Sequence, residues 1–246
     1  MVLLDRIAIV TGGGSGLGRA YTLGLAREGA RVAVADIVEE NAVRVAEEVK
    51  SAGGSALPVV VDVSDSPQVK AAVDCVRDKF GAPDILVNCA GIFPRRPVIE
   101  MSDEEWDRMI AVHLRGTFLF SRAVLPDMVK RGNGKIVNIA SALGIRGSLN
   151  GAHYAAAKGG IIAFTHSLAM EMAPHGISVN AICPGQTNTP LWQQGFNEET
   201  RKQRLATGEA GRPDELVGCL VFLCSDQSRP LTGDILIREF PMKWRS

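Results

Sequence analysis

Tyr154 and Lys158 are candidates for acid–base chemistry because of their types and their spacing. Residues four apart lie on the same face of a helix, so a phenol and an ammonium can be neighbours there. The unperturbed pKa of tyrosine is near 10, which makes it a poor base at neutral pH, but a nearby positive charge favours the phenolate. Tyr154 could then exchange a proton with a substrate oxygen. Taken alone, this spacing is more typical of a solvated surface pair, so the interpretation depends on the rest of the chain.

A glycine-rich segment, residues 11–18, follows an apolar run typical of a strand and precedes a helical pattern. Glycines allow a tight turn and let backbone N–H groups approach a pyrophosphate, while the N-terminus of the following helix favours an anion. A glycine-rich turn would otherwise be weak evidence, but this strand and helix are the context of a dinucleotide site. The predicted cofactor contacts in this segment are Gly12, Ser15, Gly16, Leu17 and Gly18.

Asp36 closes the second expected strand, where a carboxylate can bind both adenosine-ribose hydroxyls of a dinucleotide. It would also repel the additional phosphate of NADP(H), at about 4 kcal/mol for one charge pair at 4 Å and an effective dielectric constant of 20. Neither Gly13 nor Ile37 supplies a compensating cation. We therefore predict NAD(H) as the cofactor, with contacts from Asp36 and Ile37. The alternative is that Asp36 only caps the helix expected from residue 38.

Two further strand ends carry residues suited to a cofactor. Asp62 and Val63 end the third expected strand, where a side-chain acceptor could meet an adenine amino group. Asn88, Ala90 and Gly91 follow the fourth strand and place small residues where a cofactor passes close to the backbone. Each motif alone could equally be turn chemistry, but their position at successive strand ends favours a binding site.

Ser141 ends the fifth expected strand, where its hydroxyl could hold a substrate oxygen. Beside a nicotinamide cofactor, Tyr154 could take a proton from a substrate alcohol as hydride leaves, or donate one in the reverse direction. The positive ring of the oxidised nicotinamide would favour the phenolate, as Lys158 does.

The elements that must position these residues follow from hydrophobic periodicity. Short apolar, β-branched runs alternate with longer segments of helical period. The expected strands are residues 7–11, 31–36, 56–62, 85–88, 135–141, 177–184 and 234–237. The expected helices are residues 17–28, 38–52, 67–80, 104–131, 154–173 and 214–225. Several strand runs are continuously apolar, as in parallel sheets covered on both faces.

This alternation predicts a single α/β domain over residues 1–246, with a doubly wound, Rossmann-type parallel sheet of seven strands flanked by helices. The ligand crevice of such a fold lies at the carboxyl ends of the strands, where the strand order reverses. All the candidate residues above lie at or after such strand ends, apart from the Tyr154 and Lys158 pair on a helix.

Composition excludes several functional classes. The 246 residues are 46% hydrophobic and 22% charged, which fits a globular chain and not a disordered one. Lys and Arg number 27, as do Asp and Glu, so the chain lacks the basic excess that binds nucleic acid or anionic membranes. No secretory signal is visible, the five cysteines are scattered, and His153, His166 and His175 lack metal-ligand spacing. We predict a cytoplasmic protein with no nucleic-acid, membrane or metal partner.

Taken in order, these motifs resemble the short-chain dehydrogenase/reductase family. The likeness covers nearly the whole chain, including the Gly-x-x-x-Gly-x-Gly spacing and the thirteen-residue step from Ser141 to Tyr154. The resemblance implies that Tyr154 is the general acid/base and that Ser141 orients the reacting carbonyl or hydroxyl. It implies that Lys158 binds the nicotinamide ribose and lowers the pKa of Tyr154.

The resemblance also implies further cofactor contacts. Asn88, Ala90 and Gly91 would flank the cofactor ribose. The nicotinamide carboxamide would be held by the segment containing Pro184, Gly185, Thr187 and Thr189, with Thr189 the expected threonine. Members of the family usually form dimers or tetramers, so we expect a homodimer or homotetramer.

His113 is a departure from the family pattern, which usually has asparagine there in a Val-Asn-x-x-Gly context. That asparagine helps to hold a water that relays protons from the lysine to solvent. His113 could keep the water through its backbone carbonyl, or join the relay because imidazole titrates near neutral pH. It could also be a packed core histidine. We include His113 among the candidate catalytic residues.

The C-terminal tail departs as well, because residues 238–244 replace the Val-Asp-Gly-Gly that is common in the family. This region often borders the subunit interface, so the expectation of a particular assembly is weaker at this end.

Substrate selection is expected in the loops at the strand ends. Residues 143–151 and 191–196 are candidates, and the apolar side chains of the second could exclude water from the hydride path. Arg95 and Arg96 could attract an anionic or carrier-linked substrate, although adjacent basic residues are more often a solvated surface.

These observations predict an NAD(H)-dependent oxidoreductase that interconverts a secondary alcohol and a ketone. A 3-oxoacyl-thioester reductase is the alternative within the same chemistry, and Asp36 argues mildly against it because reductive biosynthesis usually uses NADP(H). A dinucleotide-binding regulator without turnover is a further alternative, against which Ser141, Tyr154 and Lys158 argue.

Overall fold

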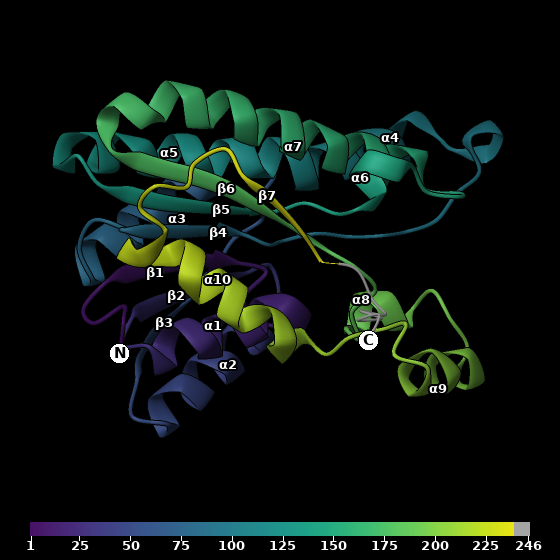
Figure 1. Ribbon diagram of the computed structural model, residues 1–246, viewed down its shortest axis with the longest axis horizontal. Coiled ribbons are helices and arrows are strands. Elements are labelled where there is room, and N and C mark those ends of the chain that lie inside the picture. Colours follow the sequence, from purple (N-terminus) through teal and green to yellow (C-terminus); the bar gives the residue numbers. More distant parts are fainter. Residues whose placement is uncertain (239–246) are drawn as a thin grey trace, which may run out of the picture.

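Seven parallel strands form the centre of the computed structural model, which describes residues 1–238 (Figure 1). The sheet order is β3-β2-β1-β4-β5-β6-β7. The strands are β1 (Ile7–Thr11), β2 (Arg31–Asp36), β3 (Ser55–Val60), β4 (Ile85–Asn88), β5 (Gly134–Ile139), β6 (Ile177–Pro184) and β7 (Ile235–Arg238). The order reverses between β1 and β4, which both pair with neighbours in parallel register. The predicted doubly wound, seven-stranded α/β fold is confirmed.

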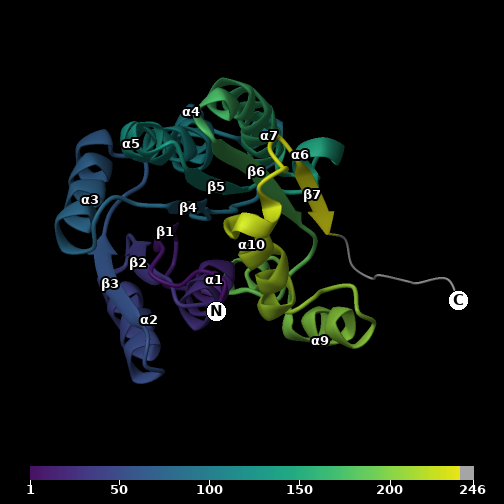
Figure 2. The ribbon, with the colours of Figure 1, turned by 60° about the vertical axis from the view of Figure 1, so that its left-hand side comes forward.

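Helices cover both faces of the sheet, as Figure 2 shows. One face carries α1 (Gly16–Arg27), α2 (Glu39–Ser51) and α10 (Val217–Cys224). The other carries α3 (Ser66–Lys79), α4 (Asp103–Ile110), α5 (Gly116–Arg131) and α7 (Ala152–Met172). Every residue of β1, β4 and β5 is buried, because their apolar side chains pack alternately into the two helix layers. The continuously apolar runs therefore mark central strands.

The segment expected as one helix over residues 104–131 is divided in the structure. Helix α4 ends at Ile110, a π-helical turn spans Ala111–Arg115, and α5 begins at Gly116. Because the i to i+5 bonding of a π turn adds one residue to a helical turn, it does not disturb the hydrophobic pattern enough to be seen in sequence. The expectation of one uninterrupted α-helix was wrong, and the interruption contains His113.

Short helices that the sequence pattern did not predict lie near the carboxyl ends of the strands. They are α6 (Leu143–Arg146), α8 (Pro190–Gln193) and α9 (Glu198–Ala206). Thr189 is the N-cap of α8, and its hydroxyl accepts a hydrogen bond from the Trp192 backbone at 3.2 Å. One or two helical turns are too short to give a periodic signal, so they were expected as loops.

Strand ends differ slightly from the prediction. β3 ends at Val60 and β5 at Ile139, so Asp62 and Ser141 lie two residues beyond their strands, in the loops at the sheet edge. Among the described residues, no helix is long and apolar enough to span a bilayer. The atypical C-terminal tail lies outside the described residues, apart from Arg238.

Candidate active site

A cleft of about 1090 Å³ opens at the carboxyl ends of β1, β4, β5 and β6. Every predicted site residue except Asn88 lines it. The cleft lies where the strand order reverses between β1 and β4, which is the position that a doubly wound sheet offers to a ligand. The structure therefore brings residues spread from Gly12 to Thr189 into one site.

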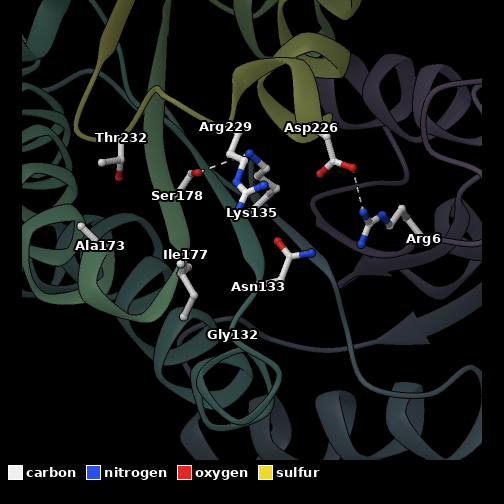
Figure 3. Close-up of a pocket in the computed structure, with 11 residues that line it drawn as sticks. Arg6, Gly132, Asn133, Lys135, Ala173, Ile177, Ser178, Asp226, Arg229 and Thr232 are labelled. Carbon is white, nitrogen blue, oxygen red and sulfur yellow. Dashed lines mark hydrogen bonds and ion pairs between the residues drawn. The ribbon is translucent and has the colours of Figure 1, made fainter.

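A second, polar cavity of about 390 Å³ lies at the opposite edge of the sheet (Figure 3). Lys135 and Ser178, near the amino ends of β5 and β6, line it, and the Lys135 ammonium donates to the Ser178 hydroxyl at 3.3 Å. Arg6 and Asp226 form an ion pair there at 3.1 Å. None of the predicted site residues lines this cavity, so it is separate from the candidate active site.

The glycine-rich loop makes a close backbone approach. A Cβ atom on Gly12 would lie 2.8 Å from the Ala90 Cα, and Gly16 has a φ of +51°. A Cβ on Gly16 would also meet the Thr189 side chain at 3.3 Å, so the segment after β6 passes over the loop. Larger residues at Gly12 or Gly16 would therefore strain the backbone or block the approach of another chain segment.

Thr11, which sequence analysis did not single out, joins this loop to the end of β4. Its buried hydroxyl accepts hydrogen bonds from the backbone N–H groups of Cys89 at 2.9 Å and Ala90 at 3.1 Å. A threonine at a strand end carried no distinct signal, because its partners lie 78 and 79 residues away.

The Asp36 carboxylate accepts two backbone hydrogen bonds, from Gly14 at 2.9 Å and from Val38 at 3.0 Å. Since a carboxylate has about four acceptor positions, it can still accept ribose hydroxyls from the cleft that it lines. The bond from Val38 is an Asx turn just before α2, whose N-cap is Val38 and which has no side-chain cap bond. The interpretation of Asp36 as a helix cap is therefore wrong.

Arg44 is a cation near this position that sequence analysis missed. From α2 its guanidinium donates to the Gly14 carbonyl at 2.7 Å and pairs with Glu48 at 2.8 Å. It is not among the residues that line the cleft. Arg44 is eight residues beyond Asp36 in sequence, and only the packing of α2 brings it to the loop.

The Asp62 carboxylate is already engaged by protein groups. It accepts bonds from the Ser64 hydroxyl at 2.6 Å and the Ser64 backbone at 2.9 Å, and it pairs with Arg108 at 3.2 Å. Burial acts to raise the pKa of Asp62, but these partners outweigh it and lower the pKa. Asp62 lines the cleft as an ionised acceptor held in a fixed orientation.

Asn88 differs from the other predicted contacts because it does not line the cleft. Its side-chain amide is buried behind the strand and donates to the Asn138 carbonyl oxygen at 2.9 Å and to the Ser121 hydroxyl at 3.2 Å. The expectation that Asn88 flanks the cofactor ribose is corrected: its side chain links β4 to β5 and α5. A residue's position at the end of a strand does not by itself determine to which face of the sheet its side chain points.

Tyr154, Lys158 and Ser141 meet at one wall of the cleft. Tyr154 and Lys158 lie in the first turns of α7, and the Lys158 ammonium is 5.7 Å from the centre of the Tyr154 ring. The same ammonium donates to the Ile139 carbonyl at 2.5 Å, which ties it to the end of β5. Ser141 follows that strand and interacts with the Tyr154 hydroxyl through a side-chain hydrogen bond.

Burial dominates the ionisation of this pair. It raises the pKa of Tyr154 to about 12, against the opposing effect of the Ser141 hydrogen bond. It lowers the pKa of Lys158 to about 8. In the protein alone, the pKa of Tyr154 is therefore raised, whereas the sequence predicted that Lys158 would lower it. The reason is that desolvation disfavours the charged form of both groups.

His113 is buried in the π-helical turn and faces two partners. Its Nε2 atom lies 2.7 Å from the Ile92 carbonyl oxygen and 3.1 Å from the Ile92 backbone nitrogen. Its ring also packs edge-on against the Tyr154 ring, with 5.2 Å between centres. Burial lowers the pKa of His113 well below its usual value, so the ring is neutral near pH 7.

The backbone carbonyl of His113 accepts a 2.7 Å hydrogen bond from the Thr117 hydroxyl. The side chain thus holds the loop after β4, and the carbonyl has a protein donor. These contacts favour a positioning role for His113 over proton transfer.

The expected substrate loops surround the mouth of the cleft. Leu191, Trp192 and Phe196 from the α8 segment line it, with 5.1 Å between the Trp192 and Phe196 ring centres. Residues from the 143–149 segment line the opposite wall. Of the adjacent arginines, Arg95 lines the cleft and Arg96 does not. The apolar side chains of the 191–196 segment thus line the cleft, and their exclusion of water from the hydride path stays a prediction.

Comparisons with known proteins agree with this geometry. The family model described as short chain dehydrogenase matches residues 6–200. The chain is 39% identical to the 3-oxoacyl-(acyl-carrier-protein) reductase FabG of Thermotoga maritima, covering 96% of this chain and 97% of that protein. It is 36% identical to the cyclopentanol dehydrogenase of a Comamonas species, covering 95% of each.

A solved structure is similarly close. The protein assigned as an NAD(P)-dependent gluconate 5-dehydrogenase of Beutenbergia cavernae, which has NADP bound at low occupancy, is 36% identical to this chain. The two superpose with a TM-score of 0.89 over 96% of this chain and 95% of that one. The chain thus shares its overall fold with this solved protein.

Proposed function

The chain belongs to the short-chain dehydrogenase/reductase family, and from that premise we propose that it is an NAD(H)-dependent oxidoreductase that interconverts a secondary alcohol and a ketone. The observation that carries the proposal is the meeting of Ser141, Tyr154 and Lys158 in a cleft that the glycine-rich loop also lines. A proton-transfer group and a nucleotide cradle in one cleft are what this reaction needs.

The residues of the cleft fit a dinucleotide. At Gly12 and Gly16 a Cβ atom would meet Ala90 and Thr189, so the loop has the bare backbone that a pyrophosphate approaches. Asp36 would bind the adenosine ribose, and Lys158 the nicotinamide ribose. Pro184, Gly185, Thr187 and Thr189 would hold the carboxamide end. When bound, the cofactor supplies the carbon that accepts or donates hydride.

Tyr154 moves the proton in this proposal. Its hydroxyl donates to the carbonyl oxygen of a ketone, or in the oxidative direction takes the proton of the alcohol. Ser141 shares that oxygen and keeps it within reach of Tyr154. The Ser141 hydrogen bond opposes the raising of the Tyr154 pKa by burial. Lys158, whose ammonium lies 5.7 Å from the centre of the Tyr154 ring, would add a positive charge beside the phenol when it is protonated.

NAD(H) is favoured over NADP(H) by the Asp36 carboxylate at the ribose position. The relative with bound NADP shows that this fold also takes the phosphorylated cofactor. In this chain, Arg44 donates to the carbonyl of Gly14, whose N–H bonds to Asp36, but Glu48 already pairs with the Arg44 guanidinium. The side chain offered to a 2′-phosphate is therefore a carboxylate.

A 3-oxoacyl-thioester reductase is the second candidate, and the 39% identity to a 3-oxoacyl-(acyl-carrier-protein) reductase favours it. A panel of cyclic and linear ketones, run beside a 3-oxoacyl thioester with NADH and with NADPH, separates the two. Faster turnover of the thioester with NADPH would select the second candidate.

The test of the oxidoreductase proposal is the variant Tyr154→Phe, assayed by absorbance of the reduced nicotinamide. We expect kcat to fall about 10²- to 10⁴-fold, because a general acid/base contributes that range, while NADH binding measured by fluorescence is retained. Tight cofactor binding by the unmodified protein without turnover of any alcohol or ketone would contradict the proposal and favour a non-catalytic regulator.

A further inference from the structure

An arginine at the mouth of the cleft is held between two aromatic rings. The Arg95 guanidinium carbon lies 5.2 Å from the centre of the Phe93 ring and 5.3 Å from that of Phe196. Phe93 follows β4, whereas Phe196 follows α8, so the arginine joins the two sides of the mouth. Stacking of this kind stabilises a guanidinium through the ring quadrupole and fixes its plane.

The same arrangement connects Arg95 to the reacting group. The Phe93 ring packs against the Tyr154 ring, with 4.2 Å between centres. One aromatic ring therefore separates the cation from the phenol, and all three side chains line the cleft. A substrate whose oxygen is bound by Tyr154 can extend along Phe93 towards Arg95.

Arg95 differs from its neighbours in its partners. Arg96 pairs with Glu105 at 3.1 Å, and Arg108 pairs with Asp62 at 3.2 Å. Arg204, also at the mouth, donates to Gln186 at 2.6 Å and lies 3.8 Å from Glu209. Within residues 1–238, by contrast, no carboxylate forms an ion pair with Arg95. Arg95 contacts the two rings yet is an exposed residue, so its N–H groups can reach a ligand in the cleft that it lines.

We propose that Arg95 binds a carboxylate of the substrate, so that the preferred substrates are ketones or secondary alcohols that carry a carboxylic acid a few bonds from the reacting carbon. This inference rests on the proposed function. A guanidinium donates two parallel hydrogen bonds in its own plane, which is the geometry that a carboxylate accepts. The wall between the two polar ends is aromatic, and suits the hydrocarbon part of such a molecule.

Arg204 adds to the positive field at this end of the cleft. Its guanidinium carbon lies 4.5 Å from the centre of the Phe196 ring, on which Arg95 also packs. Phe196 thus has two cations around it, and Trp192 lies beside it. A carboxylate bound to Arg95 would offset the mutual repulsion of these two arginines and stabilise the segment between α8 and α9 over the cleft.

The test compares matched acids and amides. The probes are 3-oxocyclohexanecarboxylate with its primary amide, and 5-oxohexanoate with its primary amide, each reduced with NADH. We expect kcat/KM of the unmodified protein to be at least about tenfold higher for one acid than for its amide, and Arg95→Met to lower it for that acid about 10- to 100-fold. The amide should change less than about twofold, because methionine keeps the packing between the rings.

Two control variants separate charge from structure. Arg96→Met removes the adjacent arginine, which pairs with Glu105 outside the cleft, and should leave the ratio of acid to amide unchanged. Arg95→Lys should restore part of the preference for the acid, since it keeps the charge without the planar fork. If Arg95→Met lowered kcat/KM equally for acid and amide, Arg95 would only brace the mouth and the proposal would be overturned.

Acetoacetyl-coenzyme A tests whether Arg95 binds a carboxylate or a phosphate, because this thioester carries phosphates but no carboxylate. If Arg95→Met lowered kcat/KM for this thioester more than for the keto acids, the arginine would bind a phosphate and the carboxylate proposal would be wrong.

A binding measurement keeps the inference separate from the proposed function. Cyclohexanecarboxylate is titrated calorimetrically into the protein with NAD, and into Arg95→Met under the same conditions. We expect its Kd to rise about tenfold or more in the variant. Binding that depends on Arg95 without turnover of any carbonyl would retain the anion site and reject the proposed function. If the unmodified protein turned over acid and amide equally, and if Arg95→Met did not change the Kd of the carboxylate, the proposed function would be retained and the anion site rejected.

Discussion

At the scale of single residues, the candidate site keeps ionisable groups in a poorly hydrated place. Lys158 is 4% exposed, and among residues 1–238 its ammonium is held by the Ile139 carbonyl and by no carboxylate. Burial lowers its pKa to about 8 and raises that of Tyr154 to about 12, so each group resists its charged form. Such perturbed groups in a cleft are typical of functional sites.

The lowered pKa of Lys158 predicts a pH-dependent difference in stability between the protein and Lys158→Met. The pKa is about 8 in the folded chain and near 10.5 in the unfolded chain, so between these values the unfolded state binds more protons. The unmodified protein should therefore gain stability relative to the variant as pH rises from 8 to 10.5, by about 3 kcal/mol at most. Urea unfolding of both proteins at several pH values measures it.

Groups far from Lys158 titrate in the same way in both proteins, so they cancel in this difference. Lys158 acts to lower the pKa values of Cys89 and His113, so these neighbours contribute a smaller difference of their own. A difference in unfolding free energy that stays constant from pH 7 to 10.5 would mean that Lys158 keeps an ordinary pKa.

Asp36 is expected to set the choice of cofactor. In Asp36→Asn the negative charge is removed while one side-chain acceptor remains for the Gly14 or Val38 backbone. The ratio of kcat/KM with NADH to that with NADPH should fall about 10- to 100-fold, because repulsion of the 2′-phosphate is lost. Steady-state kinetics with both cofactors measures this ratio.

Asp62→Asn is the matched control, since Asp62 lines the same cleft but its carboxylate is engaged by Ser64 and Arg108. In Asp62→Asn, the ratio of kcat/KM with NADH to that with NADPH should change no more than about threefold. A similar change in both variants would show that general electrostatics, and not the ribose contact, determines the preference.

At the scale of elements, the π-helical turn at Ala111–Arg115 is the feature that departs most from a regular pattern. It separates α4 from α5 and turns the His113 ring towards the loop after β4, where it contacts the Ile92 backbone. A Cβ atom on Gly91 would lie 2.4 Å from the His113 ring, so the loop and the histidine are closely fitted. Through Phe93, the same loop contacts Tyr154.

Replacing His113 by leucine should destabilise this element. The Ile92 backbone would lose one side-chain partner, either for its C=O or for its N–H depending on the His113 tautomer, and an unsatisfied polar group at a partly buried position costs up to about 1–3 kcal/mol. We expect that loss in the free energy of unfolding, together with a higher KM because Phe93 is less well placed. Chemical denaturation and steady-state kinetics are the measurements.

The pH profile distinguishes positioning from proton relay at His113. Because burial lowers the pKa of His113 well below 6.5, the profile of kcat/KM in the unmodified protein should show no step near pH 6.5 that His113→Leu removes. Such a step would show that His113 takes part in proton transfer.

At the scale of the whole molecule, the α5 and α7 layer presents apolar side chains to solvent. Phe118 on α5 is 40% exposed and Met170 on α7 is 79% exposed, and Phe118 contacts Phe164 of α7 edge-on. A layer of this kind is suited to association with a second copy of the chain.

We therefore expect a homodimer or homotetramer in solution. Light scattering after size-exclusion chromatography should give the mass of two or four chains, and Phe118→Asp should shift the population to a smaller species, because it places a charge in the apolar layer. A monomeric mass at micromolar concentration for the unmodified protein would contradict this expectation.

The sequence by itself determined the fold class and most of the cleft. Alternating strand and helix periods imply a parallel sheet, and parallel strands place their carboxyl ends at one edge. Motifs that follow strands, such as Gly12 to Gly18, Asp36 and Ser141, must therefore gather there, whatever the details of packing. This regularity explains why residues far apart in sequence could be assigned to one site.

The tertiary structure decided what depends on contacts between distant segments. Asn88 lies behind the sheet because its partners are on β5 and α5, and Arg95, not Arg96, faces the cleft because Phe196 packs on it. The direction of the shift in the Tyr154 pKa was also beyond the sequence, since burial by surrounding elements outweighs the lowering effect of the Ser141 hydrogen bond. Side-chain orientation and desolvation arise from the whole packed environment, and no local spacing specifies them.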